Sequence, residues 1–291
     1  MKSYLIVILQ FGTLCLIAQA NRFDQYITPM YDLNLLKASK VLIENPDNIP
    51  RQNLELLSIH LNWWKLNSGY KEYEGYTDST LEQITKYVDQ LEQLNDVEKL
   101  SSVSLNILEA LLIKSRVDLM DENYFDGVVG MVKCLKYMED LKENNNDIDE
   151  FKLINGLYNY YYDFAYQNYL LLRPFLMGYP EGSMEKGLID LKVLARTSES
   201  VVKAEANFFL SKIYLESEKN SSEALEYTSV VVTLHPNNFV YALLHARALK
   251  ASHNDTELFQ HCLHVQQKLE NCRALDQYSL DYFIFQFKKY D

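Results

Sequence analysis

The stretch from Ala204 to Pro236, AEANFFLSKIYLESEKNSSEALEYTSVVVTLHP, decides the fold. Apolar residues recur at helical spacing on both sides of a polar break near Asn220-Ser221. Ala224 supplies a small residue where a second helix has to approach the first closely, and Pro236 stops that second helix. The stretch therefore predicts two antiparallel helices joined by a tight turn.

The same kind of pattern extends over the whole chain. Its 291 residues are 48% hydrophobic but include only 9 Gly and 6 Pro, too few turn formers for a β-sandwich or barrel. Polar breaks separate roughly a dozen helical segments. The breaks fall near Asn45-Pro46-Asp47, Ser68-Gly69, Asn95-Asp96, Glu122-Asn123, Asn144-Asn145-Asn146, Arg173-Pro174, Tyr179 to Gly182, Arg196 to Glu199, Asn220-Ser221, His235-Pro236-Asn237, His253-Asn254 and Asn271-Cys272.

Alternate breaks lie on the order of 30–50 residues apart, which is the spacing of stacked antiparallel helix pairs. The Ala204–Pro236 stretch resembles a tetratricopeptide repeat, because Leu210, Ser211 and Tyr214 stand where the first helix of that repeat carries Leu, Gly and Tyr. Asn207 and Thr228 replace two aromatic residues of the pattern, and the turn around Asn220 holds one extra residue. We expect an all-α fold, a right-handed superhelix (solenoid) of irregular tetratricopeptide-like hairpins, with an N-terminal half at 21–146 and a C-terminal half at 147–291.

A broader resemblance covers nearly the whole chain. It rests on Trp63-Trp64, the run Gly156 to Tyr161, Pro174 to Gly178, Gly187-Leu188 and the repeat. In these features the chain looks like a family of exported bacterial tetratricopeptide proteins, mostly from the Bacteroidetes and largely uncharacterised. The resemblance implies a fold and an export route, and it implies no active site.

The first twenty residues have the features of a secretory signal peptide. Lys2 supplies the positive start, Tyr4 to Ile17 is mostly apolar, and Ala18-Gln19-Ala20 is a small-x-small cleavage site. An uncleaved N-terminal anchor is the alternative. We expect export to the periplasm or cell envelope, or release from the cell, with no integral membrane segment once the signal is removed. The net charge of −12 argues against nucleic acid and anionic lipid as partners.

The most unusual feature of the composition is the 22 tyrosines. Tyr158, Tyr162, Tyr166 and Tyr169 recur at intervals of four, four and three, which places them on one face of a helix. Such a face either packs between helix layers or contacts a peptide. We expect a protein or peptide partner in a non-catalytic interaction or scaffold role, with the binding site between these tyrosines and Asn207, whose amide suits a peptide backbone.

A rival hypothesis is an exported enzyme or metal-binding protein that uses histidines and cysteines near the C-terminus. These residues are His253, His261, Cys262, His264 and Cys272. Their spacing is not a recurrent zinc pattern, and the sequence has no G-x-S-x-G elbow, phosphate loop, G-x-G-x-x-G or H-E-x-x-H. We therefore expect no catalysis, no cofactor and no metal. Cys262 and Cys272 either pair or remain as thiols.

Overall fold

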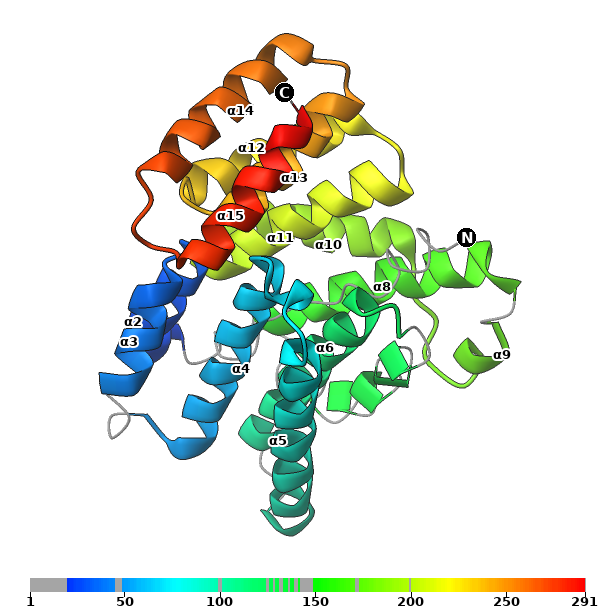
Figure 1. Ribbon diagram of the computed structural model, residues 1–291. Coiled ribbons are helices and arrows are strands. Elements are labelled where there is room, and N and C mark those ends of the chain that lie inside the picture. Colours follow the sequence, from blue (N-terminus) through cyan, green and yellow to red (C-terminus); the bar gives the residue numbers. More distant parts are fainter. Residues whose placement is uncertain are drawn as a thin grey trace. The chain divides into compact units, whose positions relative to one another are not determined.

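A computed structural model describes residues 20–44, 49–98, 101–123, 149–170, 173–198 and 200–290, with single residues and short groups between 126 and 141. All regular secondary structure in these ranges is helical, which confirms the all-α fold class (Figure 1). The expected signal peptide, apart from Ala20, and the breaks at 45–47 and 144–146 lie outside the described residues. None of the described helices combines the length and apolar character that crossing a bilayer requires.

The described helices follow one another along the chain. Their bounds are α2 Ala20–Tyr31, α3 Leu35–Glu44, α4 Arg51–Asn67, η3 Tyr70–Glu72, α5 Tyr76–Glu98, α6 Ser101–Met120, α8 Asp149–Asn168, α9 Arg173–Leu176, α10 Met184–Thr197, α11 Ser200–Lys212, the π-helical turn η5 Ile213–Ser217, α12 Ser221–Leu234, α13 Phe239–Ala251, α14 Asp255–Glu270, α15 Gln277–Phe287 and η6 Lys288–Tyr290.

Most of the expected breaks coincide with helix ends because their Asn, Asp and Ser side chains cap the next helix. Asn220, Asn238 and Asn254 accept hydrogen bonds from backbone N–H groups in the first turns of α12, α13 and α14. The expected break at Asn95-Asp96 is wrong, since α5 continues through it to Glu98. Neither residue breaks a helix as Pro does, and both are tolerated in a last turn.

The chain forms two compact units, and neither is a simple half. Unit 1 contains residues 81–206 together with 20–21, and unit 2 combines 22–80 with 207–291. Unit 2 therefore draws on both sides of residue 146, where the sequence suggests a boundary. Helices α5 and α11 each contribute residues to both units.

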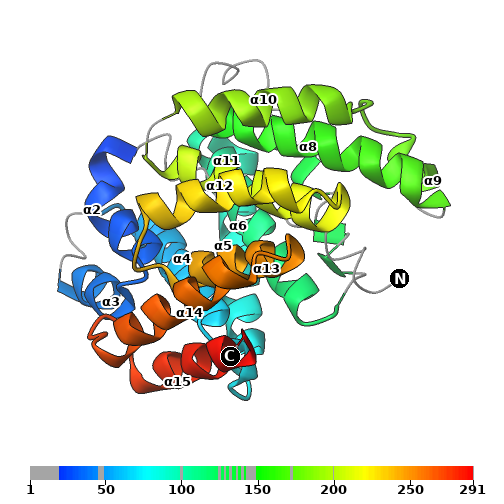
Figure 2. The same cartoon turned by 90° about the horizontal axis from the view of Figure 1, so that it is seen from above.

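Unit 1 has its closest helix pair in α8 and α10, which run side by side (Figure 2). Two glycines make this approach possible. A Cβ on Gly187 would stand 2.5 Å from the carbonyl oxygen of Gly156 and 2.6 Å from the backbone nitrogen of Tyr160. Residues without a Cβ at this crossing therefore let the two backbones meet.

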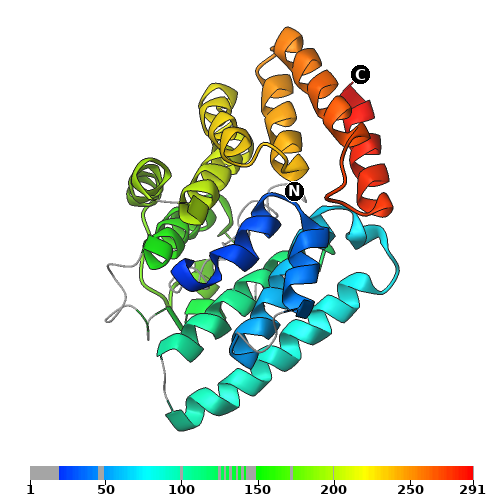
Figure 3. The same ribbon diagram turned by 90° about the vertical axis from the view of Figure 1, so that its left-hand side faces the viewer.

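In unit 2 the C-terminal helices pack consecutively, α12 on α13, α13 on α14 and α14 on α15 (Figure 3). The positions singled out by the repeat pattern are buried; they are Leu210, Ser211, Tyr214, Ala224 and Val231. The π-turn η5 lies between α11 and the turn around Asn220, and in it Glu218 N–H donates to the Ile213 carbonyl at 2.9 Å.

The N-terminal helices of unit 2 pack against its C-terminal helices through aromatic residues. The Trp64 ring lies 5.2 Å from the Tyr31 ring and 5.9 Å from the Tyr241 ring, centroid to centroid. Asn238 Nδ2 donates to the Tyr31 carbonyl at 2.8 Å while its Oδ1 caps α13. One buried amide thus joins the corner after α2 to the corner before α13.

Candidate functional site

The tyrosines expected to line a binding site occupy one face of α8 and the residue after it, but two of them are buried. The Tyr158 hydroxyl donates to the Pro180 carbonyl, and the Tyr162 hydroxyl donates to the Leu176 carbonyl at 3.1 Å. These bonds hold the irregular segment between α8 and α10. The arrangement favours packing over partner contact for Tyr158 and Tyr162.

The other two tyrosines of this stripe along α8, Tyr166 and Tyr169, are more accessible to solvent. Tyr166 is 38% exposed, and its ring is covered on one side by Arg173, whose Cζ lies 4.8 Å from the ring centroid. Tyr169 is half-buried, with its ring 6.3 Å from that of Phe164. Within unit 1, Tyr166 is thus the member of the stripe most open to solvent.

Asn207 belongs to unit 2 and is only 2% exposed. Its carbonyl accepts the Ser211 hydroxyl at 2.7 Å within the same helix. An amide at this depth cannot reach the backbone of a bound peptide. The placement therefore removes the reason for including Asn207 in a binding site.

The C-terminal histidines and cysteines do not converge. Among the described residues, no group of three or more His, Cys, Asp and Glu side chains is arranged to hold a metal ion. His261 Nε2 donates inward to the Ala242 carbonyl at 3.0 Å, whereas His264 is exposed. Cys262 is buried and Cys272 half-buried, both as free thiols.

A surface cluster of four tyrosines in unit 2 was not expected from the sequence. We call Tyr70, Tyr73, Tyr76 and Tyr278 the tyrosine cluster. The Tyr70 ring is its centre, with centroid distances of 4.9 Å to Tyr76, 5.2 Å to Tyr278 and 6.4 Å to Tyr73. Tyr73 is 59% exposed and Tyr278 37% exposed, so the cluster presents aromatic faces to solvent.

Hydrogen bonds fix the less exposed rings of the cluster. The Tyr70 hydroxyl donates to Asp276 Oδ2 at 3.1 Å, and the Tyr76 hydroxyl donates to Asn62 Oδ1 at 2.8 Å. Burial, and then neighbouring groups that include the negative charge of Asp276, raise the pKa of both phenols, so they remain protonated donors at neutral pH. Asp276 also caps α15 through its other oxygen. The cluster is therefore preorganised.

Gly69 directly precedes the tyrosine cluster, at a position where both the backbone conformation and the available space favour glycine. Its φ is +106°, and a Cβ there would lie 2.6 Å from Cγ of Tyr282. We predict that Gly69→Ala lowers the free energy of unfolding by about 2 kcal/mol through backbone strain and this clash. Gly75→Ala is the matched control, because Gly75 also has a positive φ, +73°, but a Cβ there would have no atom within 4 Å. This control substitution should lower the free energy of unfolding by about 1 kcal/mol. Equal losses in urea unfolding of both variants would contradict the clash.

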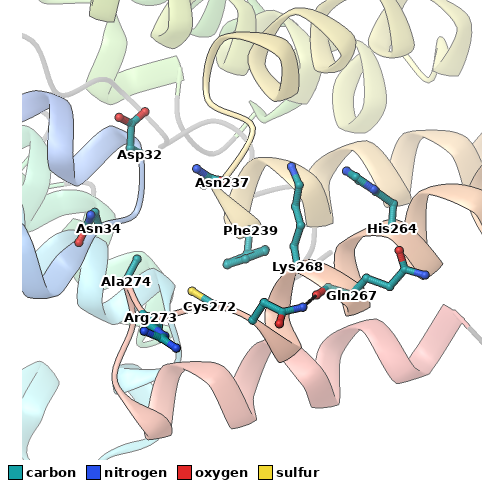
Figure 4. Close-up of a pocket in the computed structure, with 11 residues that line it drawn as sticks. Asp32, Asn34, Asn237, Phe239, His264, Gln267, Lys268, Cys272, Arg273 and Ala274 are labelled. Atoms are coloured by element: carbon teal, nitrogen blue, oxygen red, sulfur yellow. Dashed lines mark hydrogen bonds between the residues drawn. The ribbon is translucent and has the colours of Figure 1, made fainter.

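A pocket of about 510 Å³ opens where three corners of unit 2 meet (Figure 4). The corners follow α2, α12 and α14. The lining residues are Asp32, Asn34, Asn237, Phe239, His264, Gln267, Lys268, Asn271, Cys272, Arg273 and Ala274. Its volume lies in the range of small-molecule sites.

Backbone and side-chain bonds hold the three corners together. Leu36 N–H donates to the Ala274 carbonyl at 3.3 Å, and Lys268 Nζ donates to the Pro236 carbonyl at 2.8 Å. Asp32 Oδ1 lies 2.9 Å from Nδ1 of His235. Two of these links, from Leu36 to Ala274 and from Asp32 to His235, join segments about two hundred or more residues apart, so the pocket is a product of the tertiary fold. Its walls are fixed by the same contacts that join the two ends of unit 2.

The sequence analysis predicted neither the tyrosine cluster nor the pocket, and the reason is the same for both. The segments GYKEYEGY at 69–76 and YSLDY at 278–282 are visibly rich in tyrosine, but nothing local brings them together. No protein-family model, curated protein or solved structure matches the chain. The function must therefore be argued from these residues themselves.

Proposed function

We propose that this chain is a non-catalytic protein-recognition module that acts in the periplasm or elsewhere in the cell envelope. In this proposal the segment 1–20 directs export, and the hairpins follow one another as an irregular right-handed superhelix of tetratricopeptide type. The consecutive packing of α12 to α15 and the buried repeat positions support the superhelix.

The observation that carries the proposed function is the exposed, preorganised tyrosine cluster. Tyrosine supplies a large contact area at low conformational cost, which is why it is enriched at protein interfaces. Rings already held by Asp276 and Asn62 need little further ordering when a partner binds. The cluster therefore has the features of a binding hot spot.

Charge around the cluster indicates the chemistry of the partner. Glu72 and Glu74 are exposed beside Tyr73, and Asp276 lies beneath Tyr70, in a chain of net charge −12. The Tyr70 ring already has a cation over its face, Lys65 Nζ at 5.9 Å from the centroid. We infer that the partner is a protein segment rich in arginine or lysine, with its cations on the exposed faces of Tyr73 and Tyr278.

The test uses a fluorescein-labelled decapeptide of alternating arginine and glycine, with binding measured by anisotropy. Tyr73→Ala should weaken binding about tenfold, because a hot-spot aromatic is worth at least 1.4 kcal/mol. Phe285→Ala is the matched control, since Phe285 is equally exposed on α15 outside the cluster. Neither change alters the net charge, so non-specific attraction to the acidic chain stays constant. Equal affinities for the wild type and both variants would overturn the proposed function.

A further inference from the structure

The pocket between the three corners of unit 2 has a charge opposite to that of the chain. His264, Lys268 and Arg273 line it, all from α14 and the connection after it. Asp32 is the one carboxylate among its lining residues, and one oxygen of Asp32 is already engaged by His235. In a chain of net charge −12, a pocket with more cations than anions is not explained by composition.

The two permanent cations of the pocket are available to a ligand. Lys268 Nζ donates to the Pro236 carbonyl at 2.8 Å, which positions the ammonium group and leaves it two further hydrogens. Within the described part of the chain, no carboxylate pairs with Lys268 or Arg273. A guanidinium with its fork of donors open to solvent suits a carboxylate in bidentate geometry.

The remaining lining supplies the other requirements of a small-molecule site. Phe239 is buried and forms an apolar part of the wall, while Asn34, Asn237 and Gln267 offer amide groups (Figure 4). The volume of about 510 Å³ admits a small organic acid. A site with mostly fixed walls, an apolar patch and a few convergent polar groups is typical of ligand pockets.

We propose that this pocket binds a small carboxylate, which Lys268 and Arg273 hold by charge-assisted hydrogen bonds. The carboxylate comes either from a free organic acid or from the end of a polypeptide chain. This site is separate from the tyrosine cluster, so the proposal does not depend on recognition of a basic partner. The two features share only the 271–276 connection, through the bond from Tyr70 to Asp276.

Cys272 provides an internal reporter of the pocket. It lines the cavity and is half-buried, whereas Cys134 and Cys262, the other described cysteines, are buried. Iodoacetate is itself a small carboxylate, and iodoacetamide is its neutral counterpart of nearly the same size. In both reactions the thiolate forms a bond to the CH₂ carbon and iodide leaves. The ratio of the two rates therefore measures how strongly the pocket attracts a carboxylate.

The experiment compares the purified full chain with a synthetic peptide of residues 267–277, QKLENCRALDQ. The peptide carries the same lysine and arginine without the fold. We expect the iodoacetate to iodoacetamide rate ratio at Cys272, measured by mass spectrometry of the digested protein, to be about tenfold higher in the folded chain. Arg273→Gln and Lys268→Gln should each lower that ratio, and together bring it to the peptide value.

A matched variant and competitors complete the test. Lys186→Gln removes an exposed cation from α10 and should leave the ratio unchanged. Protection of Cys272 by millimolar succinate favours a free acid, whereas protection by a tripeptide acid and not by its C-terminal amide favours a chain end. A ratio in the folded chain equal to that of the peptide, or one insensitive to Arg273→Gln, would overturn the proposal.

Discussion

Acidification from pH 7 to pH 4.5 should destabilise unit 2 by about 2–3 kcal/mol through the half-buried pair His245 and His261. The two rings meet edge to face, with centroids 4.8 Å apart, between α13 and α14. Burial, and then the neighbouring His261, lower the pKa of His245 to about 4. Burial also lowers the pKa of His261. The pair is therefore neutral in the folded state at neutral pH.

Hydrogen bonds hold both histidine rings in place, and the bond to the Ala242 carbonyl opposes the effect of burial on the pKa of His261. His245 Nδ1 lies 2.8 Å from the Thr228 hydroxyl on α12, and His261 Nε2 donates to the Ala242 carbonyl. The charged groups near His261 are His264 and Lys268, which disfavour a further positive charge. Protonating the pair would place two cations side by side between packed helices.

The loss of stability on acidification follows from the difference between the pKa of His245 in the folded chain and its pKa in the unfolded chain. An unfolded histidine titrates near pH 6.5, so between about pH 6.5 and pH 4 the unfolded chain binds a proton that the folded chain excludes. Stability is therefore complete above about pH 6.5 and is lost as the pH falls toward 4. Each unit of difference between the folded and unfolded pKa corresponds to about 1.4 kcal/mol, and solvent around the half-buried ring weakens the effect.

The measurement is urea unfolding followed by circular dichroism at several pH values from 7 to 4.5. His245→Gln should remove most of the pH dependence over this window, whatever its effect at pH 7. His264→Gln should retain the wild-type slope, because His264 is exposed. The comparison of slopes cancels the contribution of carboxylates such as Glu216 and Glu150, which also titrate differently in the folded chain. A His245→Gln slope equal to that of the wild type would refute the role of the pair.

Local features of the fold were predictable from the sequence. Helical periodicity and capping residues such as Asn220 and Asn254 are properties of a few neighbouring residues, and these predictions are confirmed. Two of the three departures from the repeat pattern coincide with structural features. Thr228 is buried against His245, and the extra residue near Asn220 lies just after the π-turn η5. Comparison of the sequence with the repeat pattern identifies the positions that differ but does not explain why they differ.

The candidate sites were not predictable because they depend on contacts distant in sequence. Tyr70 meets Tyr278, and Asp32 meets His235, across about two hundred residues. A regular tyrosine stripe was visible on α8, but Tyr158 and Tyr162 use their hydroxyls to hold the following segment. Periodicity identifies a face of a helix, while only the tertiary fold decides whether that face is covered.

The largest loss of stability in unit 1 is expected for Arg116→Met, which should lower the free energy of unfolding by about 3–5 kcal/mol. Arg116 is the only lysine or arginine in the buried class among the described residues. Its Nη2 lies 3.8 Å from Oε2 of Glu205, and both side chains are about 95% removed from solvent. Glu109 is buried two turns earlier on α6. Removing the cation leaves buried acidic groups without their counter-charge.

Glu150 shows that this region already contains an excess of negative charge. Burial raises the pKa of Glu150, and the nearby carboxylates Asp149 and Glu109 raise it further. Loss of the positive charge of Arg116, which pairs with Glu205, would therefore add to this excess. Methionine retains much of the volume of the arginine side chain, so the variant tests charge more than packing.

A double-mutant cycle separates the ion pair from other effects of the substitution. Arg116→Met combined with Glu205→Gln should recover a substantial part of the stability lost by Arg116→Met alone, because the amide leaves no unpaired charge at position 205. Lys152→Met is the matched control: Lys152 pairs with Asp149 at 3.1 Å on the exposed start of α8, where an ion pair is worth at most about 1 kcal/mol. Urea unfolding is measured for the wild type, Arg116→Met, Glu205→Gln, the double variant and Lys152→Met. Losses of similar size for Arg116→Met and Lys152→Met would show that the buried arginine does not stabilise unit 1 through its charge.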